Sequence, residues 1–287
     1  MCLFMKQNKN KPKSLVLLSG GLDSRLACKI MQEQTETEAI FFILPFGSGC
    51  CSDKFCVFRF CQEQGIKLHI VDFTQGKLFE EYMNMIRKPK YPRGKALNPC
   101  IDCHIFMLKK AKALATKEKI NIIATGEVLG ERPLSQHKSA LIIVEKESGL
   151  KGRLLRPLSA KLLEETEAEK SGLIDRLKLL DMQGRQRTRQ IELAKEYKIT
   201  FPSPAGGCLL CEPEYCKRLK PLLDNVREIR DFSEHPKQKC KGIFVSGITF
   251  HDIQLLSIGR HFESSRIILG RNEKDNLVLE KEKGIKI

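Results

Sequence analysis

The chain of 287 residues contains no tryptophan, and aromatic residues make up only 7% of it. Stacking of nucleic-acid bases on aromatic side chains is therefore not expected as a main mode of recognition. No apolar run approaches the roughly 20 residues that a membrane-spanning helix needs. The first residues are apolar and then lysine-rich, which reverses the order of a secretory signal. We therefore expect no membrane partner and a cytoplasmic location.

Two common nucleotide-binding motifs are also missing. The chain has no Gly-x-x-x-x-Gly-Lys-[Ser/Thr] segment, so the lysine that usually holds the γ-phosphate is absent. The glycine turn near residue 20 does not follow the Gly-x-Gly-x-x-Gly pattern of dinucleotide folds. Internal repeats and low-complexity tracts are absent as well. Any nucleotide site must therefore be of another type.

Positive charge and cysteine are abundant. The 50 Lys and Arg residues against 35 Asp and Glu leave a net charge of +15, which favours a polyanionic partner over a merely accidental surface excess. The 12 cysteines occur without a secretory signal. In a reducing compartment, paired thiols are more often ligands or catalysts than structural disulfides.

Short apolar runs alternate with amphipathic segments through the first half of the chain. This pattern predicts strands over 14–18, 39–44, 67–73 and 120–124, and helices over 24–34, 55–64, 77–86 and 105–117. Continuous apolar strands separated by helices are typical of a doubly wound parallel α/β sheet, whose ligand lies at the carboxyl ends of the strands. Two more helices are predicted over 162–180 and 185–197, followed by a loop rich in Pro and Gly. We place a domain boundary near residue 212, which gives domains 1–212 and 213–287, the second a small α+β domain.

A turn of small residues, Ser19–Ser24, lies between the first strand and the first helix. Gly20 and Gly21 permit positive φ and a close approach of backbone N–H groups to phosphate oxygens. Ser24 is expected to cap the helix, and Asp23 to hold Mg²⁺ through water. The alternative is an ordinary strand-to-helix turn. The set predicted to bind phosphates is Ser19, Gly20, Gly21, Leu22, Asp23 and Ser24.

This Ser-Gly-Gly-Leu-Asp-Ser turn resembles the PP-loop of the ATP pyrophosphatase family, within the adenine nucleotide alpha hydrolase superfamily. Members of the family split ATP between the α- and β-phosphates and adenylate a carbonyl or carboxylate oxygen of a second substrate. The resemblance implies ATP and Mg²⁺ as cofactors and a catalytic role for Asp23. GMP synthetase, asparagine synthetase, argininosuccinate synthase and the tRNA thiolases share this loop, so it does not select one activity.

Two Cys-x-x-Cys pairs help to choose among these activities. Cys100 and Cys103 open a predicted helix, whose N-terminus favours the thiolate form on one helix face. Cys208 and Cys211 follow the breaker-rich loop. Such thiols can attack sulfur, bind a soft metal or form a disulfide. A structural four-thiolate Zn²⁺ site and unrelated buried cysteines are the two plainer interpretations.

Both segments resemble those of tRNA thiouridylases, as the Asn-Pro-Cys-x-x-Cys of 98–103 and the Gly-Gly-Cys of 206–208 indicate. The resemblance implies that Cys100 and Cys208 handle sulfur, either as a persulfide or with Cys103 as three ligands of a [4Fe–4S] cluster with one open iron. Cys211 departs from the pattern and, as a fourth ligand, would close that site. Thr125 and Gly126, in a Thr-Gly-Glu segment, resemble residues that line the nucleotide pocket.

Other segments carry weaker similarities. The Arg-Pro-Leu of 156–158 resembles a family segment near the ATP site. Cys50, Cys51 and Cys56 follow the second strand, and we expect them to line the pocket rather than to bind a metal. An ordinary strand-end turn remains the alternative for Thr125 and Gly126.

The C-terminal part of the chain is basic between residues 217 and 241. The Gly-Arg-Asn of 270–272, with Asn276, resembles the signature of the NFACT RNA-binding domain, although a small solvated cap is an equal alternative. The basic stretch and the last domain together predict RNA binding by Lys217, Arg218, Arg260 and Arg271. Phosphate and shape recognition would suit a folded RNA.

Taken together, these features predict a tRNA sulfurtransferase that uses ATP to thiolate a uridine. Its partners would be tRNA and an external sulfur donor, such as a cysteine desulfurase or sulfide. Two alternatives are a PP-loop amide or C–N ligase with structural zinc, and a non-catalytic nucleotide- and RNA-binding protein. The sequence does not decide whether the product is 4-thiouridine or 2-thiouridine, or whether a cluster or a persulfide carries the sulfur. It also does not define the oligomeric state.

Overall fold

A computed structural model describes residues 11–47, 54–92, 94, 96–202, 207–224, 248–256, 260–262 and 267–269. The chain divides into two compact units. The first comprises residues 1–94 and 98–207, and the second comprises residues 95–97 and 208–287. Each unit is described by itself below. No helix among the described residues is both long and apolar enough to cross a membrane.

The first unit is built on a parallel sheet of five strands in the order β3-β2-β1-β4-β5. The strands are β1 (Lys13–Leu17), β2 (Glu36–Ile43), β3 (Lys67–Asp72), β4 (Ile122–Thr125) and β5 (Leu154–Leu155). The register pairs Val16 with Ala39 on one side and with Ala124 on the other. Strands β1, β2 and β4 are almost wholly buried, since helices cover both faces. The predicted doubly wound α/β class is confirmed.

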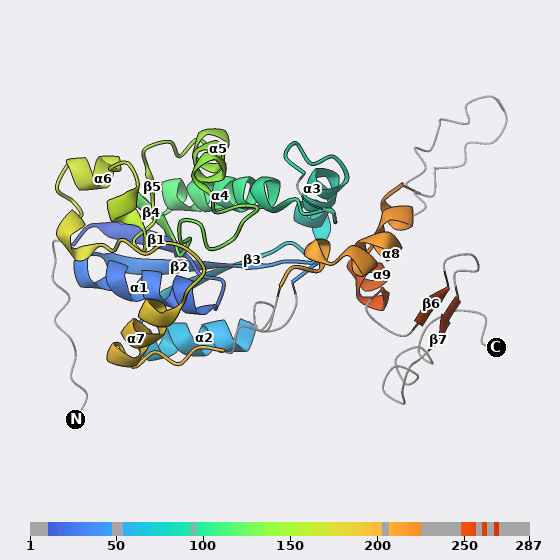
Figure 1. The fold of residues 1–287 in the computed structure, drawn as a ribbon, viewed down its shortest axis with the longest axis horizontal. Coiled ribbons are helices and arrows are strands. Elements are labelled where there is room, and N and C mark those ends of the chain that lie inside the picture. Colours follow the sequence, from blue (N-terminus) through green and yellow to red (C-terminus); the bar gives the residue numbers. More distant parts are fainter. Residues whose placement is uncertain are drawn as a thin grey trace. The chain divides into compact units, whose positions relative to one another are not determined.

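Helices flank the sheet on both sides (Figure 1). One side carries α1 (Leu22–Gln34), α2 (Lys54–Gln64) and α7 (Thr188–Glu196), and the other carries α3 (Gly76–Arg87), α4 (Cys100–Lys117) and α5 (Lys138–Ser148). On the α1 side the core contains Leu26, Ile30, Phe41, Phe60 and Ala194, all at most 2% exposed. Burial of these apolar side chains is the main force holding the layers together.

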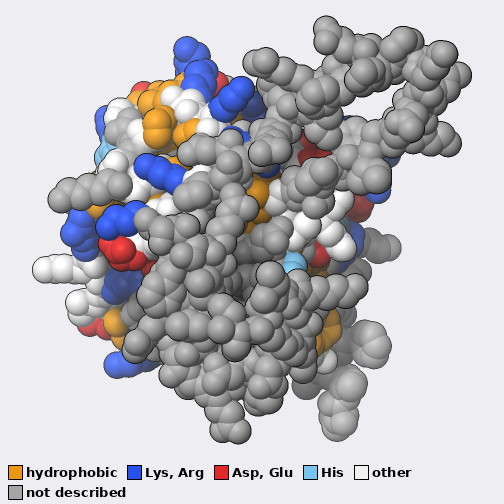
Figure 2. All heavy atoms as spheres, turned by 90° about the vertical axis from the view of Figure 1, so that its right-hand side faces the viewer, with side chains coloured by type: hydrophobic (Ala, Val, Ile, Leu, Met, Phe, Trp, Pro, Cys, Tyr) orange, Lys and Arg blue, Asp and Glu red, His pale blue; other side chains and the backbone are white. Residues whose placement is uncertain are grey.

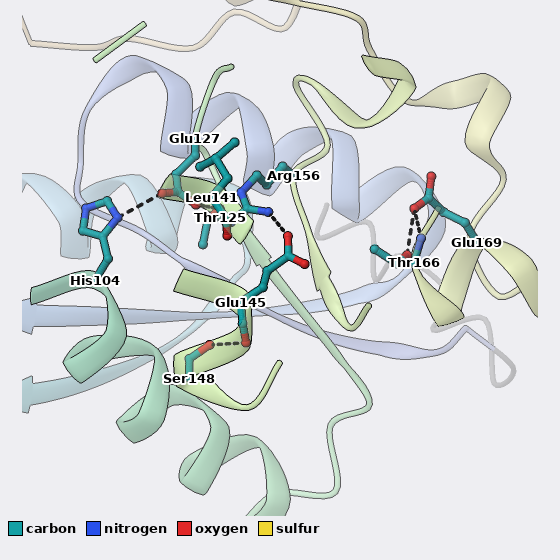
Figure 3. Close-up of polar contacts among 9 residues, drawn as sticks. All are labelled: His104, Thr125, Glu127, Leu141, Glu145, Ser148, Arg156, Thr166 and Glu169. Carbon is teal, nitrogen blue, oxygen red and sulfur yellow. Dashed lines mark hydrogen bonds and ion pairs between the residues drawn. The ribbon is translucent and has the colours of Figure 1, made fainter. Parts of the chain in front are cut away.

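The prediction of a long helix over 162–180 is wrong. The structure has only short turns there: η2 (Ala160–Leu162), α6 (Glu167–Lys170) and η3 (Arg176–Lys178). A capping box between Thr166 and Glu169 starts α6 (Figure 3), and Gly172, at φ +75°, lies just beyond its end. The sequence analysis also missed α5, where the ring of His137 accepts a hydrogen bond from the Ala140 N–H (3.2 Å).

The second unit contains η4 (Leu209–Cys211), α8 (Pro213–Asp224), α9 (Phe250–Leu255) and an antiparallel strand pair, β6 (Arg260–Phe262) and β7 (Ile267–Leu269). Tyr215 on α8 donates to the Ile253 carbonyl (3.1 Å) and so ties α8 to α9. The Cys216 thiol donates to the Leu210 carbonyl (3.3 Å) and ties α8 to η4. The basic stretch that begins at Lys217 therefore starts within α8, and its residues 225–241 lie outside the described residues.

Gly126, directly after β4, is where two segments of the first unit meet most closely. A Cβ placed on Gly126 would lie 2.6 Å from both Cα and N of Ser24, and 2.7 Å from the carbonyl carbon of Asp23. All three atoms belong to backbone, so no side chain can move aside. The contact therefore requires glycine and fixes the start of α1 against the end of β4.

Replacing Gly126 by alanine should lower the free energy of unfolding by about 3 kcal/mol, the upper part of the range for overpacking, because backbone must shift. Urea unfolding followed by circular dichroism measures this. Gly207→Ala is the control, since a Cβ there meets no atom of the described residues within 4 Å. Equal stabilities of the two variants would contradict the close approach.

Candidate active site

The carboxyl ends of β1 and β4 lie side by side at the point where the strand order reverses. From β1 the chain moves outward through β2 to β3, and it then returns to the other side of β1 as β4. Loops that follow neighbouring strands diverge at such a point and leave room for a ligand. The loop 18–21 follows β1, and the segment 126–136 follows β4. The predicted phosphate-binding turn and Thr125 therefore meet at this edge.

The turn itself is a glycine-lined helix start. Gly20 has φ +87°, as predicted, whereas Gly21 has φ −73° and is the N-cap of α1. The predicted cap by Ser24 is wrong, because the helix begins at Leu22. Ser24 instead lies in the first turn, and its hydroxyl donates to the Gly21 carbonyl (2.9 Å). Because Gly21 has no side chain to cap the N–H groups of the first turn, these groups are available to an anion.

Arg25, which is 3% exposed, supports the turn from within. Its Nε donates to the Gly20 carbonyl (2.8 Å), and its Nη1 donates to the Thr200 carbonyl (2.7 Å). Its Nη2 donates to the Cys56 thiol (2.9 Å), so Cys56 contacts this support. Cys50 and Cys51, also predicted as pocket lining, lie outside the described residues. The guanidinium of Arg25 thus fixes the carbonyl of Gly20, the glycine with positive φ.

Asp23 shares a guanidinium with a second carboxylate. Arg187 Nη2 donates to Asp23 Oδ2 (2.8 Å) and lies 2.8 Å from Glu131 Oε1. Arg187 Nε also donates to Glu131 Oε1 (3.0 Å). Burial raises the pKa of Asp23 although Arg187 opposes the shift. Burial, and then the nearby charge of Asp23, raise the pKa of Glu131.

Asp23 Oδ1 is buried and has no hydrogen-bond partner. Leaving a buried polar atom unpaired costs about 1–3 kcal/mol. The atom therefore marks a place for a donor or a cation. This fits the predicted Mg²⁺ ligand, since carboxylate oxygens are the ligands that Mg²⁺ prefers.

A hollow of about 470 Å³ adjoins these carboxylates along the chain. It is lined by Leu129, Gly130, Gln183, Gly184, Arg185 and Gln186. The two walls are joined where the Gly184 N–H donates to the Leu129 carbonyl (2.7 Å). In the sequence, Glu131 follows one wall directly and Arg187 follows the other, and these two residues pair with each other.

The buried carboxylate of Glu127 connects the nucleotide edge to the cysteine helix (Figure 3). It accepts from His104 Nδ1 (2.9 Å), from Arg156 Nε (2.9 Å) and from the Thr125 hydroxyl (3.0 Å). Arg156, 2% exposed, also pairs with Glu145 on α5. Burial alone would raise the pKa of Glu127, but Arg156 and then His104 outweigh it and hold that pKa well below its usual range.

Cys100 and Cys103 begin α4, one turn apart on one helix face, as predicted. Cys100 is half-buried, whereas Cys103 is buried with its Sγ 3.3 Å from the Tyr82 hydroxyl. The carboxylate of Asp102 accepts from the N–H groups of residues 90 and 91 (2.9 and 2.8 Å), so the preceding loop is held against this helix start. His104, the next residue after Cys103, contacts Glu127. The first thiol pair therefore lies at the same edge of the sheet as the glycine turn.

Cys208 and Cys211 belong to the second unit, where Cys208 is the N-cap of η4 and Cys211 is its last residue. The Cys211 N–H donates to the Cys208 carbonyl (2.9 Å). Among the side chains that the structure describes, no three of Cys, His, Asp and Glu gather closely enough to hold a metal ion. The thiolate metal sites therefore stay predictions.

Of the predicted RNA-binding residues, Lys217 is exposed on α8 and pairs with Glu214 (2.7 Å). Arg218 lies with its guanidinium carbon 5.8 Å from the centre of the Tyr215 ring. Arg260 is the first residue of β6, and Arg271 lies outside the described residues, as does the segment that resembles the NFACT signature. RNA binding by this unit stays a prediction.

The residues that contact the predicted motifs were not recognised from the sequence. Arg187 lies within the helix predicted over 185–197, but neither Arg187 nor Glu131 nor His104 was assigned a role. The position of His104 directly after the Cys-x-x-Cys was the one available signal. Glu131 lies 108 residues from Asp23 along the chain (131 − 23) and Arg187 lies 164 (187 − 23), so no local pattern could show that they meet.

A glycine-lined turn at the switch point of a parallel α/β sheet is an arrangement in which ligands, nucleotides among them, are commonly bound. Residues 12–144 match the family model described as "tRNA methyl transferase HUP domain". The resemblance seen in the sequence is thereby confirmed for this part of the chain.

Two curated relatives are similar to this chain. The tRNA-specific 2-thiouridylase MnmA of Acidithiobacillus ferrooxidans is 33% identical over 119 residues, which is 40% of this chain and 33% of that protein. The probable tRNA sulfurtransferase of Thermoanaerobacter pseudethanolicus is 28% identical over 233 residues, which is 78% of this chain and 51% of that protein. This chain thus spans between a third and a half of these relatives.

Among solved structures, the U34-tRNA thiolase NcsA from Methanococcus maripaludis, determined with its [4Fe–4S] cluster, is 20% identical. The match covers 84% of this chain and 78% of that one, at a TM-score of 0.39.

Replacing Glu127 by glutamine should destabilise the protein by about 3 kcal/mol at pH 7, because Arg156 would keep a buried charge without its carboxylate. Unfolding in urea measures the loss. Glu81→Gln is the control, since Glu81 is paired with Lys110 at the surface, where such pairs contribute at most about 1 kcal/mol.

The stability that the Glu127 ion pairs contribute should fall as the pH is lowered. The folded state lowers the pKa of Glu127 below its ordinary value of 4.5. The stabilisation is therefore complete above pH 4.5 and is lost as pH falls below it. The stability difference between wild type and Glu127→Gln should shrink in that range. A difference that stays constant between pH 7 and pH 3 would contradict the assigned ion pair.

Proposed function

We propose that this protein is an ATP-dependent tRNA sulfurtransferase, which activates a uracil carbonyl oxygen as an adenylate and then replaces it with sulfur. One observation carries the proposal. The bonds from His104 to Glu127 and the backbone contact of Gly126 with Asp23 and Ser24 place the cysteine helix and the glycine turn at one edge of the sheet. A nucleotide-activating loop beside a thiol pair suits adenylation followed by attack of sulfur. The names of the two curated relatives agree with this reaction.

In the first step, the uracil oxygen attacks the α-phosphorus of ATP, the bond to the β-phosphate breaks, and pyrophosphate leaves with the bonding electron pair. The N–H groups at the start of α1 would stabilise the negative charge that develops on the departing phosphates. Mg²⁺, when bound at Asp23, would neutralise part of the same charge. The carbonyl oxygen thereby becomes part of a good leaving group, AMP.

In the second step, a sulfur nucleophile attacks the activated carbon, and AMP leaves. If Cys100 or Cys208 carries the sulfur as a persulfide, the outer sulfur forms the new bond to carbon. The thiolate of the other cysteine then attacks the inner sulfur, the S–S bond breaks, and the two cysteines are left as a disulfide. An external persulfide donor and a thiol reductant complete this cycle.

The same thiols suit a [4Fe–4S] cluster, for which Cys100, Cys103 and Cys208 would be the ligands. When bound, such a cluster would supply an open iron that takes up sulfide, and no disulfide would form. Both schemes require that Cys208 reaches the edge occupied by Cys100. Iron, zinc and acid-labile sulfide, determined in protein purified without oxygen, distinguish the cluster, the structural zinc and the metal-free persulfide.

The net charge of +15 supports tRNA as the substrate. On the face shown in Figure 2, blue Lys and Arg side chains outnumber the red Asp and Glu ones among the described residues. Lys217 of the second unit is exposed and would contact phosphate. Contacts of this kind bind RNA through its shape and backbone rather than through its base sequence.

Incubation with ATP, Mg²⁺, tRNA and a sulfur donor should yield AMP, pyrophosphate and thiouridine, resolved by nucleoside chromatography. Cys100→Ala should form AMP and pyrophosphate but lose thiouridine by at least about 100-fold, because the sulfur-carrying group is gone. Cys28→Ala, a change in the core on α1, is the matched control and should retain both products. Release of ADP and phosphate by the wild type, or full thiolation by Cys100→Ala, would exclude the mechanism.

A further inference from the structure

Arg187 joins two carboxylates that face the nucleotide edge, and neither the motif resemblances nor the comparisons assign it a role. Its guanidinium makes three contacts of 2.8–3.0 Å with Asp23 and Glu131. We infer that Arg187 binds the triphosphate of ATP, exchanging its bonds to these carboxylates for bonds to phosphate oxygens. This inference rests on the proposed function and adds a substrate-binding residue to it.

The charges around Arg187 indicate that these side chains can bind an additional cation or exchange their partners. Two largely buried carboxylates share the guanidinium of Arg187, and Asp23 Oδ1 is buried without a hydrogen-bond partner. Arrival of Mg²⁺ at Asp23 would satisfy Oδ1 and release Nη2 of Arg187 for another anion. A planar guanidinium binds phosphate oxygens through two parallel bonds, so a triphosphate is a suitable new partner.

The position of Arg187 also suits this role. Arg187 is the N-cap of α7 and directly follows the segment 183–186, which forms one wall of the hollow of about 470 Å³. Glu131 directly follows the other wall. The hollow is within the size range of small-molecule sites, and Arg187, next to one of its walls in the sequence, contacts Asp23. The chain lacks the lysine that holds the γ-phosphate in other nucleotide loops, and Arg187 would supply the missing positive charge.

Equilibrium binding of ATP with Mg²⁺, and of adenosine, by the full chain tests the inference by isothermal titration calorimetry. Arg187→Gln should weaken ATP binding by about 10- to 100-fold, the range for bonds to a charged group. The same variant should leave adenosine binding unchanged, because adenosine has no phosphate. Arg189→Gln is the matched control on the same helix. Arg189 pairs with exposed Asp181. The affinity of Arg189→Gln for ATP should therefore stay within about twofold of the wild-type value.

Glu131→Gln provides a test of opposite sign and keeps the inference testable if Arg187→Gln does not fold. It removes one of the two groups that compete with phosphate for Arg187, so ATP should bind about 3- to 10-fold more tightly. Thermal unfolding checks each variant. Wild-type ATP affinity in Arg187→Gln, equal losses for ATP and adenosine, or unchanged or weaker ATP binding in Glu131→Gln would each overturn the inference. Failure of the wild type itself to bind ATP would instead overturn the proposed function.

Discussion

The carboxylate of Glu127 and the bare backbone of Gly126 hold the candidate active site together. Glu127 is buried, yet it stays charged because Arg156, His104 and Thr125 all direct donors at it. Through His104 it fixes the helix that carries the first thiol pair. The adjacent Gly126 packs directly on the backbone at the start of α1. Two consecutive residues thus set the positions of the nucleotide turn and the cysteine helix.

This arrangement has a chemical consequence. A buried carboxylate without positive partners would take up a proton, and its neighbours would lose their fixed positions. Arg156 prevents this and is itself held by Glu145 of α5, so the helices on one face of the sheet act on the site through ion pairs. Asp23 is different. Its pKa is raised and one of its oxygens is unpartnered, so the glycine turn keeps a group that can still accept a ligand.

Much of the fold could be predicted from the sequence because its signals are local. Continuous apolar runs give β1, β2 and β4, and the Ser-Gly-Gly-Leu-Asp-Ser turn marks the first strand-to-helix connection. The predicted helix over 162–180 failed because its apolar spacing matched a helix while Gly172 and the turn-forming residues beside it did not allow one. The cap assigned to Ser24 was wrong by three residues, since the N-cap is Gly21, which has no side chain to cap the first N–H groups.

The site could be predicted only in part. The glycine turn and the first thiol pair are motifs contained in a few consecutive residues. Arg187 and Glu131 reach Asp23 from far along the chain, and they meet only because the loops after β1 and β4 and the start of α7 share one edge. Contacts between residues so far apart cannot be predicted from the spacing of residues in one sequence. The structure was needed to find them, and they led to the assignment of Arg187.

The central claim is that the turn 19–24, the segment 126–131 and the segment 183–187 form one nucleotide site beside the thiols of α4. Hydrogen–deuterium exchange of the full chain, measured with and without ATP and Mg²⁺, tests it most directly. The account predicts slower exchange in all three segments and in residues 100–104 when nucleotide is bound. Unchanged exchange in these segments at saturating ATP, with protection confined to another part of the chain, would contradict it.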